Sequence, residues 1–110
     1  VIMTNHVHMV ISKKSDTMLE GIMRDMKKFT SVKIIEAIRN ESESRRDWML
    51  SIFRTAGKSN GNNTTYQFWQ QDNHPIECNT AEILAQKMEY VHENSVKAGF
   101  VERAEDWMFS

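Results

Sequence analysis

Residues 5–12, Asn-His-Val-His-Met-Val-Ile-Ser, decide the fold expected from this sequence. Polar and apolar side chains alternate from His6 to Met9. Because successive side chains of a strand point to opposite faces, the alternation predicts a β-strand with both histidines on one face. The preceding residues, Thr4 and Asn5, are typical of a turn. The chain is therefore expected to finish one strand before Thr4 and to enter a second strand at His6.

Two longer segments have apolar side chains at helical spacing. The first is expected to form one helix from about Thr17 to Arg39. The second starts at Asn79, which suits a helix N-cap, and runs to about Asn94. Gly99 then favours the end of that helix, because glycine readily adopts a positive φ.

The middle of the chain is interpreted as a helix, a loop and a strand. Residues 48–53 suggest a shorter amphipathic piece, and residues 57–65, rich in Gly, Asn, Ser and Thr, suggest a loop. The aromatic run at residues 66–70 predicts a strand. Strands together with helices make an α+β fold, and the length suits one domain covering residues 1–110.

Composition argues against several classes of protein. No run of about 18 apolar residues is present, so no transmembrane helix and no membrane partner are expected. The first residues lack the charged start and the long apolar stretch of a signal peptide. The single cysteine, Cys78, cannot form an internal disulfide and suits a reducing compartment. These features predict a cytoplasmic protein.

Charge is unevenly distributed along the chain, although the net charge is −1. Residues 13–58 carry 11 Lys and Arg against 7 Asp and Glu, a net of +4. Residues 59–110 carry 3 Lys and Arg against 8 Asp and Glu, a net of −5. A basic middle suits contact with phosphates, but the same pattern is also typical of two ordinary solvated faces.

His6 and His8 are the first candidates for a chemical site. On one face of a strand, two neutral imidazoles can bind one divalent ion. A third ligand must then come from another part of the chain. The pair alone also describes two histidines on a half-exposed strand.

Tyr90 and Asn94 are the second candidates. They are four residues apart on the expected last helix, so they share a face. Asn94 offers an oxygen ligand, and Tyr90 offers a phenol, which is a weak nucleophile until its proton is removed or its target is polarised. Taken alone, the pair also fits a core tyrosine beside a helix-terminal asparagine.

Taken together, these blocks resemble a known family. Residues 5–8, Asn-His-Val-His, resemble a segment of the HUH single-tyrosine transposases of insertion-sequence-200 type, and residues 68–70, Phe-Trp-Gln, resemble their Phe/Trp-Gln strand. Residues 90–101, Tyr-Val-His-Glu-Asn-Ser-Val-Lys-Ala-Gly-Phe-Val, resemble the tyrosine signature of the branch associated with repetitive extragenic palindromes. Residues 105–107, followed by Ser110, match the family's usual ending, and the order of the blocks fits.

The resemblance implies a ferredoxin-like transposase domain with the tyrosine on a C-terminal helix. Compared with the family, this chain lacks the first strand, the first helix and most of the second strand. The histidine strand would then have an exposed edge. Two chains completing each other's sheet, a truncated gene product or a trimmed chain would each account for that edge. A homodimer is expected, because family members often work as dimers.

Two residues depart from the family's pattern. Thr4 and Ser95 stand where the family has proline. Thr4 should loosen the turn before the histidines, because proline fixes φ. Ser95 no longer forces the helix to end at Asn94. Neither change removes a functional group.

The resemblance also implies a reaction, that of a DNA transposase. His6, His8 and Asn94 would hold Mg²⁺ or Mn²⁺, and Tyr90 would attack a phosphate of single-stranded or hairpin DNA. The products would be a 5′-phosphotyrosine and a free 3′-OH, and attack by a different 3′-OH would rejoin strands. Basic residues of the middle segment are the candidate contacts to DNA phosphates: Lys27, Lys28, Lys33, Arg45 and Arg46.

Two other functions stay open at the level of sequence. A decayed transposase remnant would bind DNA without cutting it. A metal-dependent hydrolase would use His6, His8 and either His74 or His92, with Tyr90 in a structural role. A covalent adduct that depends on Tyr90 separates the transposase from both.

Overall fold

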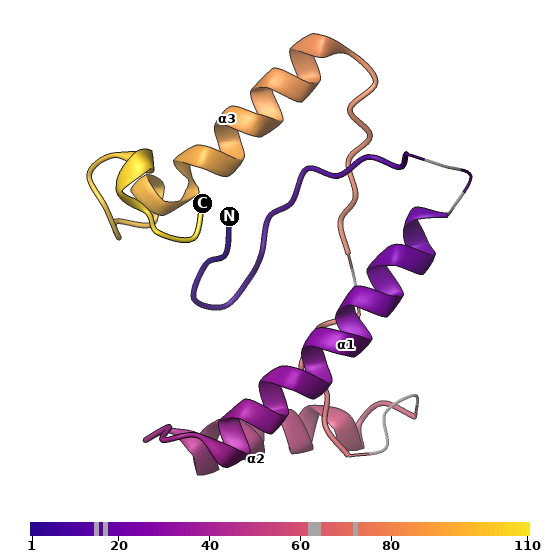
Figure 1. Cartoon of the computed structure of the whole chain (residues 1–110), viewed down its shortest axis with the longest axis vertical. Coiled ribbons are helices and arrows are strands. Elements are labelled where there is room, and N and C mark those ends of the chain that lie inside the picture. The colour runs from indigo at the N-terminus through magenta and orange to yellow at the C-terminus, as the bar shows by residue number, and fades with distance from the viewer. Residues whose placement is uncertain (15, 17, 62–64, 72) are drawn as a thin grey trace. The chain divides into compact units, whose positions relative to one another are not determined.

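The computed structural model describes residues 1–110 except residues 15, 17, 62–64 and 72. Within the described residues the order of elements is α1 (Leu19–Asn40), α2 (Arg46–Lys58), α3 (Ala81–Lys97) and a short 3-10 helix, η1 (Ala104–Asp106). Irregular segments connect the helices (Figure 1). Internal contacts divide the chain into two compact units, Lys13–His74 and a second unit formed by Val1–Ser12 with Pro75–Ser110.

The expected α+β, ferredoxin-like fold is wrong, because the described residues form helices and no sheet. The strand predicted at His6 contributes only to an isolated antiparallel bridge between Ile2 and Val7. The strand predicted at residues 66–70 is irregular, and there Gln67 N donates to Phe53 O of α2. The two segments belong to different units. Alternating side chains predict an extended backbone, but a sheet also needs partner strands to accept its hydrogen bonds.

The helices predicted in the first half of the chain are present with shifted ends. α1 covers the first long helix, whose expected start at Thr17 lies outside the described residues. α2 is longer than the predicted amphipathic piece and includes Gly57 and Lys58, for which the sequence predicts a loop. Part of that predicted loop, residues 62–64, also lies outside the described residues.

α3 begins one residue later than predicted and ends later. Its N-cap is Thr80 rather than Asn79, and the Thr80 hydroxyl accepts a hydrogen bond from Ile83 N at 3.2 Å. The helix continues to Lys97, which a serine rather than a proline at position 95 permits. Gly99 follows with a φ of 74°, a conformation that glycine adopts without a steric penalty.

The unit Lys13–His74 is built on contacts between α1 and α2. Ile35 and Ile38 of α1 are buried in it. Arg46 Nε donates to Ile38 O at 2.9 Å, so the first residue of α2 satisfies a carbonyl near the end of α1. Trp69 Nε1 donates to Thr30 Oγ1 at 2.9 Å, which attaches the segment after α2 to the middle of α1.

The second unit joins segments from opposite ends of the sequence. Ile2 N donates to Phe109 O at 2.8 Å, and Trp107 Nε1 donates to Ile2 O at 3.0 Å. The Trp107 ring stacks on Phe100, with ring centroids 5.3 Å apart. Phe100 N in turn donates to the carbonyl of Ser95 in α3 at 3.0 Å. The segment after α3 therefore links the N-terminal residues to that helix.

Large apolar side chains are often exposed in this chain. Phe29 of α1 and Trp48 of α2 are both more than half exposed, at 66% and 62%. Among the described residues, the buried apolar side chains are Met3, Ile35 and Ile38. None of the helices formed by the described residues combines the length and the apolar character needed to cross a bilayer.

Two glycines, each within a helix, are expected to respond in opposite ways to alanine. A Cβ at Gly57 would lie 2.9 Å from Thr65 O and 3.2 Å from Gln67 N, whereas a Cβ at Gly21 meets only the end of Arg24 at 4.0 Å. We expect Gly57→Ala to lower the free energy of unfolding by about 2 kcal/mol through overpacking. Gly21→Ala should raise it by about 0.5 kcal/mol through helix propensity. Urea unfolding followed by circular dichroism measures both, and a stabilised Gly57→Ala would contradict the close approach of residues 65–67.

Ser95 provides a test in the second unit. Its side chain is fully buried, and within the described part of the chain its Oγ has no hydrogen-bond partner. A buried hydroxyl without a partner destabilises a fold by about 1–3 kcal/mol. We therefore expect Ser95→Ala to raise the free energy of unfolding by about 1 kcal/mol. A loss of stability in the same unfolding measurement would show that the hydroxyl makes a stabilising contact in solution.

Candidate functional site

A tight turn positions the two histidines. Met3 N donates to His6 O at 2.9 Å, and His8 N donates to Val1 O at 3.0 Å. Val1 N donates back to His8 O at 2.8 Å. These backbone hydrogen bonds fix the histidine segment locally, although no sheet forms there.

His6 is exposed, and its neighbour Asn5 orients its ring. The Nδ1 atom of His6 lies 2.6 Å from Asn5 Oδ1. With the amide oxygen as acceptor, His6 donates from Nδ1, and a neutral His6 ring would then carry its lone pair on Nε2. The rings of His6 and His8 meet edge to face, with centroids 4.8 Å apart. The two imidazoles are therefore neighbours, as the sequence predicts, on a turn rather than on a strand.

His8 also contacts the two candidate residues of α3. Its ring lies edge to face against Tyr90, with centroids 5.4 Å apart. Its side chain is hydrogen-bonded to Asn94. Asn94 Nδ2 donates to Tyr90 O at 2.8 Å, so Asn94 Oδ1 is the atom available to accept from His8. The structure thus brings His6, His8, Tyr90 and Asn94 together within one unit.

The environment of His8 favours its neutral form. Partial burial lowers the pKa of His8 below its ordinary value of 6.5, and the nearby His6 lowers it further. The hydrogen bond that His8 donates to Asn94 opposes this shift. A neutral imidazole has the lone pair that a metal ligand needs. The lowered pKa of His8 therefore favours the form of this imidazole that could act as a metal ligand.

Lys97 is a neighbour of Tyr90 that sequence reasoning missed. Its Nζ lies 5.6 Å from the centroid of the Tyr90 ring. Tyr90 itself is 47% exposed, so its ring is accessible to a large substrate. The seven-residue spacing of Tyr90 and Lys97, two turns of helix, is the sequence signal that predicts this contact. An ammonium beside an accessible phenol can attract an anionic substrate.

Most of the predicted DNA contacts make hydrogen bonds or ion pairs within the unit Lys13–His74. Lys27 Nζ donates to Gln70 O at 2.9 Å. Lys33 is paired with Glu36 at 3.0 Å, and Arg45 with Glu43 at 3.1 Å. Exposed pairs of this kind are weak, so Lys33 and Arg45 can exchange their partners for phosphate.

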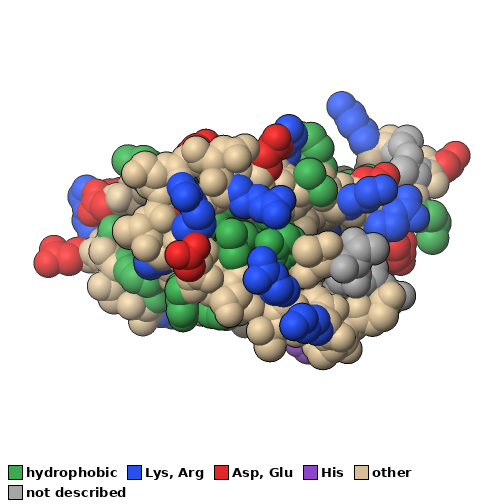
Figure 2. Space-filling model, turned by 90° about the horizontal axis from the view of Figure 1, so that it is seen from below, with side chains coloured by type: hydrophobic (Ala, Val, Ile, Leu, Met, Phe, Trp, Pro, Cys, Tyr) green, Lys and Arg blue, Asp and Glu red, His purple; other side chains and the backbone are tan. Residues whose placement is uncertain are grey.

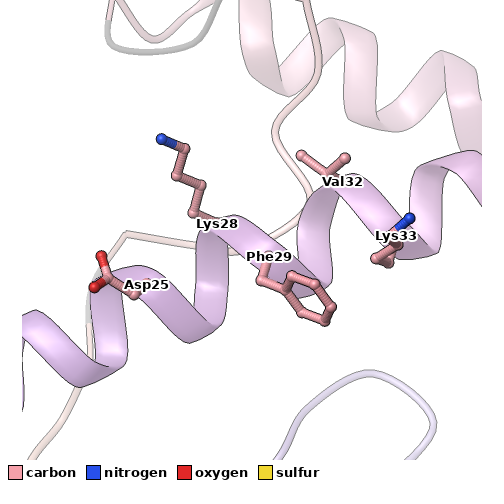
Figure 3. Close-up of a pocket in the computed structure, with 5 residues that line it drawn as sticks. All are labelled: Asp25, Lys28, Phe29, Val32 and Lys33. Atoms are coloured by element: carbon pink, nitrogen blue, oxygen red, sulfur yellow. The ribbon is translucent and has the colours of Figure 1, made fainter.

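Arg46 and Lys28 differ from the other predicted contacts. Arg46 donates to the carbonyls of Ile38 and Glu41, which gives it a structural role at the end of α1. Lys28 lines a shallow pocket on α1 and projects from the helix (Figure 3). The walls of that pocket include the exposed Phe29. The five predicted DNA-contact residues therefore differ in how readily their charges could bind a phosphate.

Surface charge alone does not select an interface. On the face drawn in Figure 2, Lys and Arg side chains lie beside Asp, Glu and apolar side chains. Positive and negative groups are interspersed there. Overall charge on this face therefore does not distinguish a binding surface from the rest.

The other two histidines bear on the hydrolase alternative. His92 and His8 both line a shallow, mostly apolar pocket beside α3. His74 belongs to the unit Lys13–His74. Among the described residues, no group of three His, Cys, Asp or Glu side chains is arranged to hold a metal ion. A three-histidine centre is thus not assembled in the described part of the chain, whereas the oxygen of Asn94 accompanies His6 and His8.

Comparison of the chain with protein-family models, curated proteins and solved structures finds no match.

The lowered pKa of His8 predicts a pH dependence of stability. The folded state binds this proton less readily than the unfolded state, whose histidine titrates near 6.5. As the pH falls through about 6.5 towards the lower pKa of folded His8, the unfolded state takes up more protons and the free energy of unfolding decreases. Urea unfolding at several pH values between about 7.5 and 5.5, in a chelator, measures this decrease.

His8→Asn should reduce that dependence. His74→Asn, a change at an exposed histidine, is the matched control and should leave the dependence unchanged. Equal pH slopes in the original chain and in His8→Asn would show that the pKa of His8 is not shifted by folding.

Proposed function

We propose that this chain cleaves and rejoins single-stranded or hairpin DNA through a covalent 5′-phosphotyrosine at Tyr90. The observation that supports it best is the contact of His8, near the start of the sequence, with Tyr90 and Asn94 of α3. A phenol, two imidazoles and an amide oxygen gathered at one partly exposed place are the groups that such a reaction requires.

The donor set suits a divalent cation. A neutral His6 would carry its lone pair on Nε2, His8 favours the neutral form, and Asn94 offers its Oδ1. Two imidazoles and one oxygen would leave positions open for phosphate and water. The imidazole nitrogens favour Mn²⁺ over Mg²⁺, which prefers oxygen ligands. When bound, the ion would supply polarisation of the scissile phosphate.

Tyr90 is the nucleophile in this proposal. Its phenol oxygen forms a bond to phosphorus and loses its proton, while the bond between phosphorus and the 3′ oxygen breaks. The departing strand takes a proton and leaves as a free 3′-OH. In the reverse direction a different 3′-OH attacks the phosphotyrosine and releases the phenol. No external energy source is needed, because one phosphodiester is exchanged for another.

Two neighbours would position the nucleophile and its substrate. Asn94 Nδ2 donates to the backbone carbonyl of Tyr90, which couples the amide to the residue that reacts. Lys97 places a positive charge beside the Tyr90 ring, where it would attract the DNA phosphate. The expectation that two copies of the chain form a homodimer still rests on the family resemblance.

A covalent-adduct assay tests the proposal. The full chain is incubated with end-labelled single-stranded hairpin DNA and Mn²⁺, and the products are separated under denaturing conditions. We expect a labelled protein band that is lost in Tyr90→Phe. Tyr66→Phe removes the only other tyrosine of the sequence and is the matched control, which should still form the adduct when the DNA is saturating. His8→Ala should reduce adduct formation by about 100-fold, as loss of a metal ligand or its support does.

Each of the other outcomes would support a different function for this chain. DNA retention with no adduct in any sample would indicate a binding remnant. Cleavage that survives Tyr90→Phe would indicate a hydrolase. An adduct lost equally in Tyr66→Phe and Tyr90→Phe at saturating DNA would overturn the assignment of Tyr90.

A further inference from the structure

Two arginines converge on one tyrosine in the unit Lys13–His74. Arg39 lies in the last turn of α1, and Arg54 lies in α2. Their guanidinium carbons are 5.4 Å and 5.6 Å from the centroid of the Tyr66 ring. Arg54 Nη2 also lies 3.1 Å from the Tyr66 hydroxyl, to which it donates. Residues from two helices and the following segment therefore build one cluster.

The cluster is strongly positive around the phenol. The hydrogen bond from Arg54 lowers the pKa of Tyr66, and the charges of Arg54 and Arg39 lower it further. Lys58 lies one helical turn beyond Arg54 and adds a third positive charge on the same face of α2. Asp47, two turns before Arg54, is about 10 Å away along the helix axis and neutralises little of it.

The two guanidiniums have no acidic partner in the described part of the chain. The ion pairs found there involve Arg24, Lys33, Arg45 and Arg103, and none involves Arg39 or Arg54. Each guanidinium faces the Tyr66 ring without a carboxylate partner among the described residues, so an anion beside these like charges would be favoured. Guanidinium groups bind phosphate through paired N–H donors.

We propose that Arg39, Arg54 and Tyr66 form a clamp for a backbone phosphate of single-stranded DNA. The identity of the polymer rests on the proposed function, whereas the clamp rests on this cluster alone. The cluster is open to solvent, and an exposed phosphate site binds a polymer better than a free ion because neighbouring phosphates meet further cations such as Lys58. Unlike Arg46, whose donors satisfy backbone carbonyls, the clamp arginines keep most of their donors for a ligand.

A binding assay without chemistry tests the clamp. The full chain is titrated into a fluorescein-labelled single-stranded oligonucleotide in EDTA, and anisotropy is followed over a series of KCl concentrations. Removing one phosphate contact should flatten the plot of log K against log salt by about 0.7. We expect Arg39→Gln and Arg54→Gln each to show this change with a several-fold loss of affinity at low salt. The double variant should lose more than either single variant.

Three matched variants separate the clamp from general effects. Arg24→Gln removes the same charge from an exposed arginine of α1 that is paired with Asp25, and should leave the slope unchanged. Arg54→Lys should restore the salt slope but only part of the affinity, because lysine lacks the paired donors. Tyr66→Phe keeps the ring and removes the hydroxyl, and should weaken binding less than loss of either arginine. Circular dichroism of each variant shows that the helices are retained.

The outcomes that overturn the clamp differ from those that overturn the nuclease. Equal losses in Arg24→Gln and Arg54→Gln would show a dependence on net charge alone. Full affinity in the double variant would remove the clamp, whatever the result of the adduct assay. Release of the oligonucleotide by inorganic phosphate, but not by chloride at equal ionic strength, would reassign the clamp to free phosphate. A missing adduct with clamp-dependent DNA binding would overturn only the chemistry.

Discussion

The candidate site depends on the attachment of the N-terminal segment to the residues that follow α3. Ile2 accepts from the Trp107 indole and donates to the carbonyl of Phe109. Backbone hydrogen bonds then carry the chain through its turn to His8, which contacts Tyr90. Without this attachment, the position of the histidine segment relative to α3 would not be fixed. The relation between the histidines and the tyrosine is therefore set by backbone hydrogen bonds and a stacked indole rather than by a sheet.

In the other unit, the arrangement of charge matters more than its amount. Lysines and arginines are common between residues 13 and 58, yet several of them satisfy carbonyls or carboxylates nearby. Arg46 stabilises the junction of two helices, whereas Arg39 and Arg54 face a shared phenol. Residues of one type thus have different roles, and the role follows from the groups that each guanidinium meets. Net charge in a segment does not distinguish them.

Sequence reasoning predicted the helices better than the overall fold. Apolar spacing located α1 and α3, and Gly99 marked the end of α3, because these signals act within a few residues. The alternation at His6 and the aromatic run at residues 66–70 predicted strands that did not form. Strand pairing is a long-range property, and neither segment finds a partner strand within the described residues.

The proximity of the candidate residues is the part of the site that the structure shows. Strand and helix spacing paired His6 with His8 and Tyr90 with Asn94, a resemblance of motifs joined the two pairs, and the structure places them close together. Their chemical role stays a prediction. The neighbours that depend on packing were not predicted. The convergence of Arg39 and Arg54 requires the contact of α1 with α2, which no local pattern of residues encodes.

The unit that contains the candidate site is built from two separate segments of the sequence, and this affects how it folds. The unit Lys13–His74 is continuous, whereas the unit that contains the candidate site joins Val1–Ser12 to Pro75–Ser110. Bringing the outer segments together closes a loop of roughly 60 residues, at an entropic cost of about 4 kcal/mol if the loop is unstructured. A folded middle unit shortens the effective loop and reduces that cost. During synthesis, the histidines leave the ribosome long before Trp107, so the candidate site can form only after nearly all of this sequence has emerged.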